Sequence, residues 1–392
     1  MDLRPQQIRN GRPPVDTFTD FAWLEDVALS ANLPAQRDIT KTEVVSYTGT
    51  AVVIPTRNRA DLVRNAVKSV LEQPEFDAPV LISDNSTSLN QRAELRQYAG
   101  GLKNSRVHYI APPEPLSMTR HWDWAMENAL ALYEASHISI LTDRMMFKSG
   151  ALKPLLEIIR AYPDKILTYM HDMVDDFSRP VVVRQYTWTG NLYEVSSTRL
   201  LELVARSLVY DSSIPRMLNC IVPRALLEAI RGRFGNFFDS IAPDWNFAFR
   251  SLAVVDSTLF YDRASLVHYA QDRSNGQSAN YGITNSAYQD FVRDLGSLPR
   301  NFAAPFPEIM TVWNAIISEY CHTKKVTQSP KFPELDMEKY VHALAVGIER
   351  IIDPERRQSM REALSARGTP PPPIAGGSPS PRHASLASEH PG

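Results

Sequence analysis

The sequence predicts an α/β fold built on a mainly parallel sheet flanked by helices. From residue 51 onward, short apolar runs alternate with segments of helical period, a pattern that implies right-handed crossovers between parallel strands. The first two runs, residues 51–59 (AVVIPTRNR) and 79–86 (PVLISDNS), each end in polar residues. Because ligands bind beyond the carboxyl ends of parallel strands, these ends are expected to share a crevice that suits a base, a ribose and a diphosphate. The residues concerned are Thr56, Arg57, Asn58, Asp84 and Asn85.

The individual elements are expected in the following order. After the first strand, Leu62, Ala66 and Val70 share one face of a helix. Period and composition then assign the remaining elements. Strands are expected at residues 51–55, 80–83, 107–110, 137–142, 166–170 and 180–186, and further helices near residues 89–99, 117–135, 198–207 and 223–233.

The chain is expected to divide into four parts. Residues 1–48 form an N-terminal extension, and residues 49–280 form the main domain. Residues 281–367 form a small helical C-terminal region, because their apolar side chains recur at helical spacing. Residues 368–392 are rich in Pro, Gly and Ser and have little apolar surface to bury, so this tail is expected to be disordered.

Composition restricts the class of protein and its compartment. The 392 residues are 43% hydrophobic, which is ample for a sizeable core, and the net charge of -2 argues against nucleic acid as a partner. Cys220 and Cys321 lie far apart and outside any CxxC pattern, so neither a disulfide framework nor a structural zinc site is indicated. No secretory signal and no transmembrane segment of about 18 apolar residues is expected. A cytoplasmic protein is predicted, with attachment to a membrane surface left open.

Four separate blocks carry a resemblance to a known family. In chain order they read VVIPTRNRADLVRNAVKSVL, LISDNS, PLSMTRHWDWAMENAL and ILTDRMMFKSGAL. Together they resemble family 2 glycosyltransferases of the GT-A fold, over roughly residues 50–278. The resemblance implies a nucleotide-binding sheet, a nucleotide-diphosphate sugar as donor and a reaction that inverts the anomeric centre. It also implies a broad role in polysaccharide or glycolipid biosynthesis.

The resemblance implies a nucleotide pocket at the strand ends. Pro55, Thr56 and Arg59 would line it, and Asp84 would contact the base or the ribose. Physical chemistry agrees in outline, because a carboxylate accepts hydrogen bonds from ring N–H and hydroxyl groups, while arginine suits phosphate. The alternative for Asp84 and Asn85 is ordinary turn chemistry.

The main departure from the family lies at Asp143. The family's usual metal motif is a carboxylate pair, DxD, that holds Mg²⁺ or Mn²⁺ against the diphosphate. Here the run TDRMM from Thr142 has one carboxylate, which alone cannot form that pair, so a divalent metal cofactor is left open. One hypothesis is that Arg144, with nearby Lys148, supplies the positive charge instead. The alternative is that Arg144 simply pairs with Asp143 or with a surface acid.

Asp244 is the candidate catalytic base. An inverting transfer needs a group that takes the proton of the acceptor hydroxyl, and a carboxylate suits this task. The run IAPDW that contains Asp244 resembles the family's acidic motif at the start of a helix. The alternative is a helix-capping aspartate without a catalytic role, and Asp239 is the competing acid.

A late region resembles the segment that closes over the donor diphosphate. Ser274 and Asn275, in the run SNGQS, would contact the donor. His268 would contact phosphate or, with Asp143, bind the metal, but a lone histidine in an apolar strand is more often a core residue. A similar choice between ligand and core applies to four residues, which are His121, Trp122, Trp124 and Trp245.

The predicted function is therefore that of an inverting glycosyltransferase. It would move a sugar from a nucleotide-diphosphate donor to an unknown carbohydrate, lipid or other hydroxyl acceptor. The absence of GxGxxG after the first strand and of GxxxxGK[ST] excludes dinucleotide dehydrogenases and P-loop enzymes. The alternative is a catalytically inactive GT-A fold that binds a nucleotide sugar or regulates a partner, because the carboxylate pair is incomplete.

Overall fold

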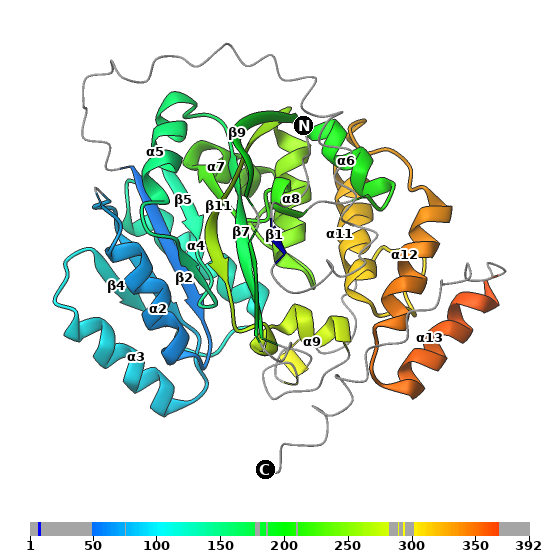
Figure 1. Ribbon diagram of the computed structural model, residues 1–392, viewed down its shortest axis with the longest axis horizontal. Helices are drawn as coiled ribbons and strands as arrows, with labels where there is room; N and C mark the ends of the chain where they lie inside the picture. The colour runs from blue at the N-terminus through cyan, green and yellow to red at the C-terminus, as the bar shows by residue number, and fades with distance from the viewer. Residues whose placement is uncertain are drawn as a thin grey trace.

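A computed structural model describes most of the chain between residues 49 and 367. The described residues are 7–8, 49–74, 76–176, 181–185, 187–208, 211–281, 289, 293–294 and 302–367. Apart from residues 7–8, the expected N-terminal extension lies outside them, and so does the tail at residues 368–392, so the disorder expected there is not tested. Figure 1 shows a central sheet with helices on both sides, which confirms the α/β class.

Four strands form the parallel part of the sheet. They are β2 (Thr50–Thr56), β3 (Val80–Asp84), β4 (Val107–Ile110) and β5 (His137–Ile140), in the spatial order β4-β3-β2-β5. In the register of β2 and β3, Thr56 lies opposite Asp84. The polar ends of the first two apolar runs therefore meet at one edge of the sheet, as predicted.

The other part of the sheet is mostly antiparallel, which corrects the expectation of a mainly parallel sheet. Beyond β5, the spatial order continues β10-β7-β8-β1, and each of these pairings is antiparallel. β11 runs parallel to β7 but antiparallel to β6 and β9. The bounds are β1 (Gln7–Ile8), β6 (Met145–Phe147), β7 (Leu167–Asp175), β8 (Val182–Gln185), β9 (Thr187–Ser196), β10 (Cys220–Pro223) and β11 (Ser257–His268).

Several of these strands were not assigned from the sequence, for identifiable reasons. β6 and β10 are only 3 and 4 residues long, which is too short for a periodic pattern. β9 is interrupted by Gly190, whose φ is 71°. β11 shifts register between Tyr261 and Ala264, so its two faces do not alternate regularly.

Helices cover both faces of the parallel strands. Val52 and Ile54 of β2 pack against α2 and α5, whereas Ala51 and Val53 pack with α4, α7 and α8. The alternation follows from the two-residue period of a strand. The helices are α2 (Ala60–Leu71), α3 (Leu89–Gly101), α4 (Met118–Leu132), α5 (Leu152–Ala161), α6 (Ser197–Ala205), α7 (Arg224–Phe234), α8 (Pro243–Val254) and α9 (Asn275–Tyr281).

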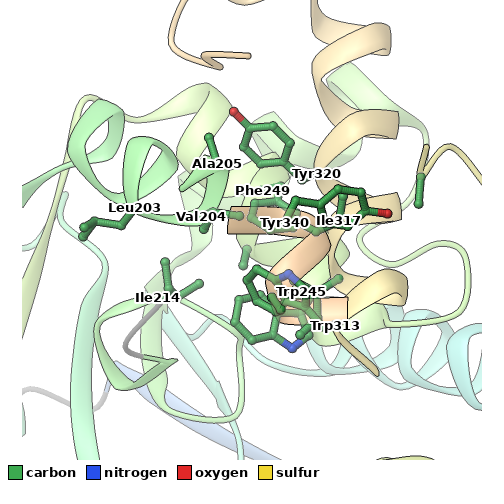
Figure 2. Packing of buried hydrophobic residues seen from close by; sticks show 14 of the residues in the cluster. Leu203, Val204, Ala205, Ile214, Trp245, Phe249, Trp313, Ile317, Tyr320 and Tyr340 are labelled. Carbon is green, nitrogen blue, oxygen red and sulfur yellow. The ribbon is translucent and has the colours of Figure 1, made fainter. Parts of the chain in front are cut away.

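The expected C-terminal helices are α11 (Val312–Thr327), α12 (Met337–Glu349) and α13 (Pro354–Ala366). They lie across the sheet from α2 and α3, coloured orange to red in Figure 1. One apolar cluster joins them to α6 and α8, and Figure 2 shows Trp245 and Phe249 of α8 packed beside Ile317 and Tyr320 of α11. The C-terminal helices and β11 thus share a core. No helix in the described part of the chain combines the length and hydropathy required to cross a membrane.

Candidate active site

Asp143 lies just beyond β5, where three of the predicted site residues converge. Thr56 donates its hydroxyl hydrogen bond to Oδ2 of Asp143 at 2.8 Å, and Arg59 forms an ion pair with Oδ1 at 3.3 Å. The Asp143 residue is only 2% exposed. The second terminal nitrogen of Arg59 donates to the backbone carbonyl of Arg273 at 2.6 Å. Pro55 is buried one residue earlier in β2.

The guanidinium of Arg144 reaches the end of β11. Its Nη1 lies 3.0 Å from Nε2 of His268, and its backbone carbonyl accepts a hydrogen bond from Tyr269 N–H at 3.0 Å. Burial, assisted by the charge of Arg59, lowers the pKa of Arg144 to about 10. The guanidinium remains charged at neutral pH, and the carboxylate of Asp143 pairs with Arg59 rather than with Arg144.

His268 is held as a neutral ring. Burial first, and then the positive charge of Arg144, place the pKa of His268 well below its usual value. The ring also packs edge-on against His171, with 5.8 Å between the centroids. A neutral imidazole nitrogen can accept the hydrogen bond from Arg144, so the cation and the histidine are compatible neighbours.

The residues around Asp143 do not fit a resident divalent cation. Both of its carboxylate oxygens already accept hydrogen bonds, from Thr56 and Arg59, and His268 faces Arg144. Across the described residues, no group of three or more His, Cys, Asp or Glu is placed to hold a metal ion. A hard cation prefers several oxygen ligands, and this arrangement offers an arginine in their place.

Lys148 does not join the group around Arg144. Its Nζ forms an ion pair with Oδ2 of Asp172 at 2.8 Å. In this geometry the nearly buried Asp172 neutralises the ammonium, and the hypothesis that Lys148 assists Arg144 stays a prediction. Arg59 is the second cation beside Arg144 instead, as its effect on the pKa of Arg144 shows.

Asp84 and Asn85 are hydrogen-bonded within the fold at the end of β3. The carboxylate of Asp84 accepts from the backbone N–H of Ser86 and from the hydroxyl of Tyr109, both at 2.8 Å. Burial and this contact with Asp84 raise the pKa of Tyr109 to about 12. Asn85 both donates to and accepts from the backbone of Leu116 at 2.8 Å. The turn chemistry considered as the alternative is thus present at Asp84, whereas Asn85 holds a segment that is distant in sequence.

His121, Trp122 and Trp245, on α4 and α8, pack against buried residues of the fold. His121 is 3% exposed, and its Nε2 lies 2.8 Å from the hydroxyl of Ser83. Burial, followed by the charge of Arg57, lowers the pKa of His121 to about 3. Trp122 packs edge-on against Phe238, and Trp245 is 7% exposed within the cluster of Figure 2.

Ser274 and Asn275 lie at the start of α9, next to Arg59. The contact runs through Arg273, whose carbonyl accepts from Arg59 and whose side chain pairs with Asp61 at 2.6 Å. Ser274 caps the short helix by accepting from Gln277 N–H at 3.3 Å. The loop that contains Ser274 and Asn275 therefore lies beside the Asp143 end of the sheet.

Asp244 occupies the first turn of α8. The helix begins at Pro243, and the Asp244 side chain is 21% exposed, 3.7 Å from Nη1 of Arg216. The guanidinium of Arg216 also lies over the ring of Trp245, 5.2 Å from its centroid. The position near a helix N-terminus favours the ionised carboxylate. The competing acid, Asp239, instead forms an ion pair with Arg250 at 3.5 Å.

Two residues that contact the Asp244 segment were missed by sequence reasoning. Arg216 lies in a loop with no motif around it. Glu319 lies on α11, and its carboxylate accepts from the backbone of Ile241 and Ala242 at 3.2 Å. A signal for Glu319 did exist, because it is an acid between Ile316 and Tyr320 on an otherwise apolar helix face.

The sheet order and the strand-end residues define a class of protein. A parallel β4-β3-β2-β5 unit with arginine and aspartate at its carboxyl edge is typical of domains that bind a phosphorylated ligand there. Residues 51–199 match the family model described as Glycosyl transferase family 2, so this part of the chain resembles the glycosyltransferases of that family. Asp143 and Arg144 lie inside the matched range, whereas Asp244 and His268 lie beyond it.

Among solved structures, the chain is similar to TarS of S. aureus. The crystal structure of TarS 1-349 in complex with UDP-GlcNAc matches with 13% identity and a TM-score of 0.46, covering 82% of this chain and 88% of that one. The crystal structure of S. aureus TarS matches with 14% identity and a TM-score of 0.43, covering 82% of this chain and 53% of that one. No functionally curated protein matches the chain in sequence.

Proposed function

We propose that this chain is an inverting glycosyltransferase that uses a nucleotide-diphosphate sugar. The match to the family 2 model supports the transferase activity. The observation that carries the proposal is the convergence of two arginines, Arg59 and Arg144, with Asp143 at the carboxyl edge of the parallel strands. Donor contacts are proposed for the residues that surround this point, which are Pro55, Thr56, Arg59, Asp84, Asp143, Arg144, Ser274 and Asn275.

In the proposed reaction, Asp244 takes the proton of an acceptor hydroxyl. The hydroxyl oxygen attacks the anomeric carbon, the bond from that carbon to the diphosphate oxygen breaks, and the nucleoside diphosphate leaves with the bonding electrons. Attack from the face opposite the leaving group inverts the anomeric centre. The charge that develops on the diphosphate is what a fixed guanidinium stabilises best, because its planar fork matches phosphate oxygens.

We propose that Arg59 and Arg144 supply this charge without a divalent cation. Support comes from the partners of Asp143, whose two oxygens already accept from Thr56 and Arg59. Arg144 supports it too, because its buried guanidinium keeps a pKa of about 10 and is therefore charged in the working pH range. Mg²⁺ and Mn²⁺ are accordingly proposed to be dispensable for transfer.

Thermal unfolding with a panel of UDP, GDP and dTDP sugars tests the donor site. Each donor is added with Mn²⁺, with Mg²⁺ or with a chelator, since a ligand at 100 times its Kd stabilises the folded state by about 2.7 kcal/mol. A midpoint shift with one donor in chelator supports the proposal, and release of the matching nucleoside diphosphate with an acceptor establishes transfer. Binding without any release, across a broad acceptor panel, would favour the inactive binding protein. No shift with any donor would refute both.

A further inference from the structure

A buried glutamate from the C-terminal helices lies beneath the start of α8. Glu319 on α11 is 0% exposed. Its Oε1 accepts from the backbone N–H groups of Ile241 and Ala242, both at 3.2 Å, and its Oε2 accepts from Nδ2 of Asn246 at 2.9 Å. Three donors from one segment therefore converge on a single carboxylate.

This segment needs support from outside. Ser240 has φ of 63°, a left-handed conformation that a residue with a Cβ adopts only when its surroundings hold it. Thr119 of α4 donates to the carbonyl of Ser240 at 2.8 Å, and Arg250 pairs with Asp239. Glu319 is the partner that reaches the two residues immediately before the helix.

The helix itself begins without a side-chain cap. Its N-cap is Ala242, which has no polar side chain, and its first residue is Pro243, which has no N–H. The carbonyl of Ala242 accepts the first helical hydrogen bond from Asn246 N–H at 2.8 Å. Glu319 therefore fixes Ala242 through its N–H while Asn246 fixes it through its carbonyl, and Asp244 lies two residues further on.

We propose that Glu319 is a positioning residue that orients the start of α8, and with it Asp244, toward the acceptor hydroxyl. The inference rests on the proposed function, in which Asp244 is the base. The position of a general base must be held within a fraction of an ångström, and supporting hydrogen bonds commonly provide this precision. The proposal also gives the C-terminal helices a role in the reaction, because α11 supplies the Glu319 carboxylate.

Burial and hydrogen bonding act in opposite directions on the charge of Glu319. Burial raises the pKa of Glu319 to about 7, while hydrogen bonds from Ser240, Asn246, Ala242 and Ile241 act in the opposite direction. Burying a carboxylic acid in such surroundings costs folding free energy, so a role beyond packing is expected for Glu319.

Glu319→Gln tests the proposal, because glutamine has the same shape as glutamate but replaces one acceptor oxygen with an NH2 group, which donates. In this variant the new NH2 group faces one of the N–H donors of the segment. The hydrogen bond at that point is lost, which loosens the segment. The double variant Glu319→Gln/Asn246→Asp restores an acceptor opposite the new amide, since the aspartate can also keep the contact with Asp239 N–H that Asn246 makes at 3.1 Å. Tyr340→Phe is the matched control, because it removes a buried hydrogen bond to Asn314 on α11 without touching the segment.

Two readouts are needed. Amide hydrogen exchange of the peptide covering residues 239–247 reports whether the segment is held, independently of activity. Turnover at saturating donor, together with the donor Kd from a titration, reports whether holding the segment matters. We expect Glu319→Gln to speed exchange at least ~10-fold and to lower kcat ~10- to 100-fold with donor Kd within 2-fold. The double variant should recover most of both, and Tyr340→Phe should change neither.

Each outcome decides the inference. Unchanged exchange in Glu319→Gln, or faster exchange with kcat equal to that of the Tyr340→Phe control, would overturn it. Failure to recover in the double variant would also count against it. The Asp244→Asn variant, run in parallel, separates the two levels of the argument. If that variant keeps full turnover, the proposed base is wrong, whereas the exchange comparison still decides whether Glu319 holds the segment.

Discussion

His121 is predicted to make the stability of this protein sensitive to mild acid. The folded pKa of His121 is about 3, against an ordinary value of 6.5, because the ring is buried and Arg57 is nearby. The unfolded chain therefore binds a proton that the folded chain does not, so stability falls as pH falls through this window. Between pH 7.5 and pH 5.0, the expected loss from this one group is about 2 kcal/mol, from 1.36 kcal/mol per unit of pH below 6.5.

Urea unfolding of the wild type and of His121→Asn at the two pH values measures this loss. Asparagine retains a polar group near the Ser83 hydroxyl, which lies 2.8 Å from the histidine ring, but does not titrate. The free energy of unfolding of the wild type should fall by about 2 kcal/mol more than that of the variant on acidification. A constant difference between the two proteins from pH 7.5 to pH 5.0 would refute the reasoning, because it would mean that the buried ring carries its proton or that water reaches it.

The remaining predictions concern the proposed reaction. Asp244→Asn should lower kcat by about 10²- to 10⁴-fold with donor binding retained, because it removes the proton acceptor. Asp239→Asn is the matched comparison, and equal losses of kcat in both variants would contradict the assignment of Asp244 as the base. Arg144→Ala should abolish the donor-induced rise in unfolding midpoint. Arg231→Ala, which removes a half-exposed surface arginine, should leave this rise intact. A normal rise in Arg144→Ala would contradict the proposed donor contact of Arg144. Transfer measured in excess chelator should match transfer in Mg²⁺ or Mn²⁺, and a steep loss of turnover in chelator would show that Asp143 needs a cation.

The strand-end part of the site was predictable because its signal is local. Apolar runs that end in Thr56 and Asp84 predict two neighbouring parallel strands, and the register then places these residues side by side. What the sequence left open was how the charges pair. The ion pair of Asp143 with Arg59 rather than Arg144 depends on the direction in which each side chain leaves its turn, and no spacing rule encodes that direction.

The segment around Asp244 was less predictable because its contacts span long stretches of chain. Glu319 meets Ala242 across 77 residues, and β11 pairs with three different strands. The antiparallel half of the sheet was missed for a related reason, since β10 is only 4 residues long and is placed by its partners rather than by its own pattern. Asp244 was found only because a family resemblance singled out its motif.

The ion pair between Arg59 and Asp143 has a consequence for how a phosphate would arrive. Asp143 takes the place that a phosphate would occupy, since it pairs with the guanidinium while Thr56 donates to its carboxylate. A side chain already confined in this way has little rotational freedom left to lose, and its charge is already out of bulk water. On the proposed function, an incoming diphosphate therefore exchanges one anion for another at a prepared cation, and the carboxylate it displaces remains nearby to reclaim the arginine when the product leaves.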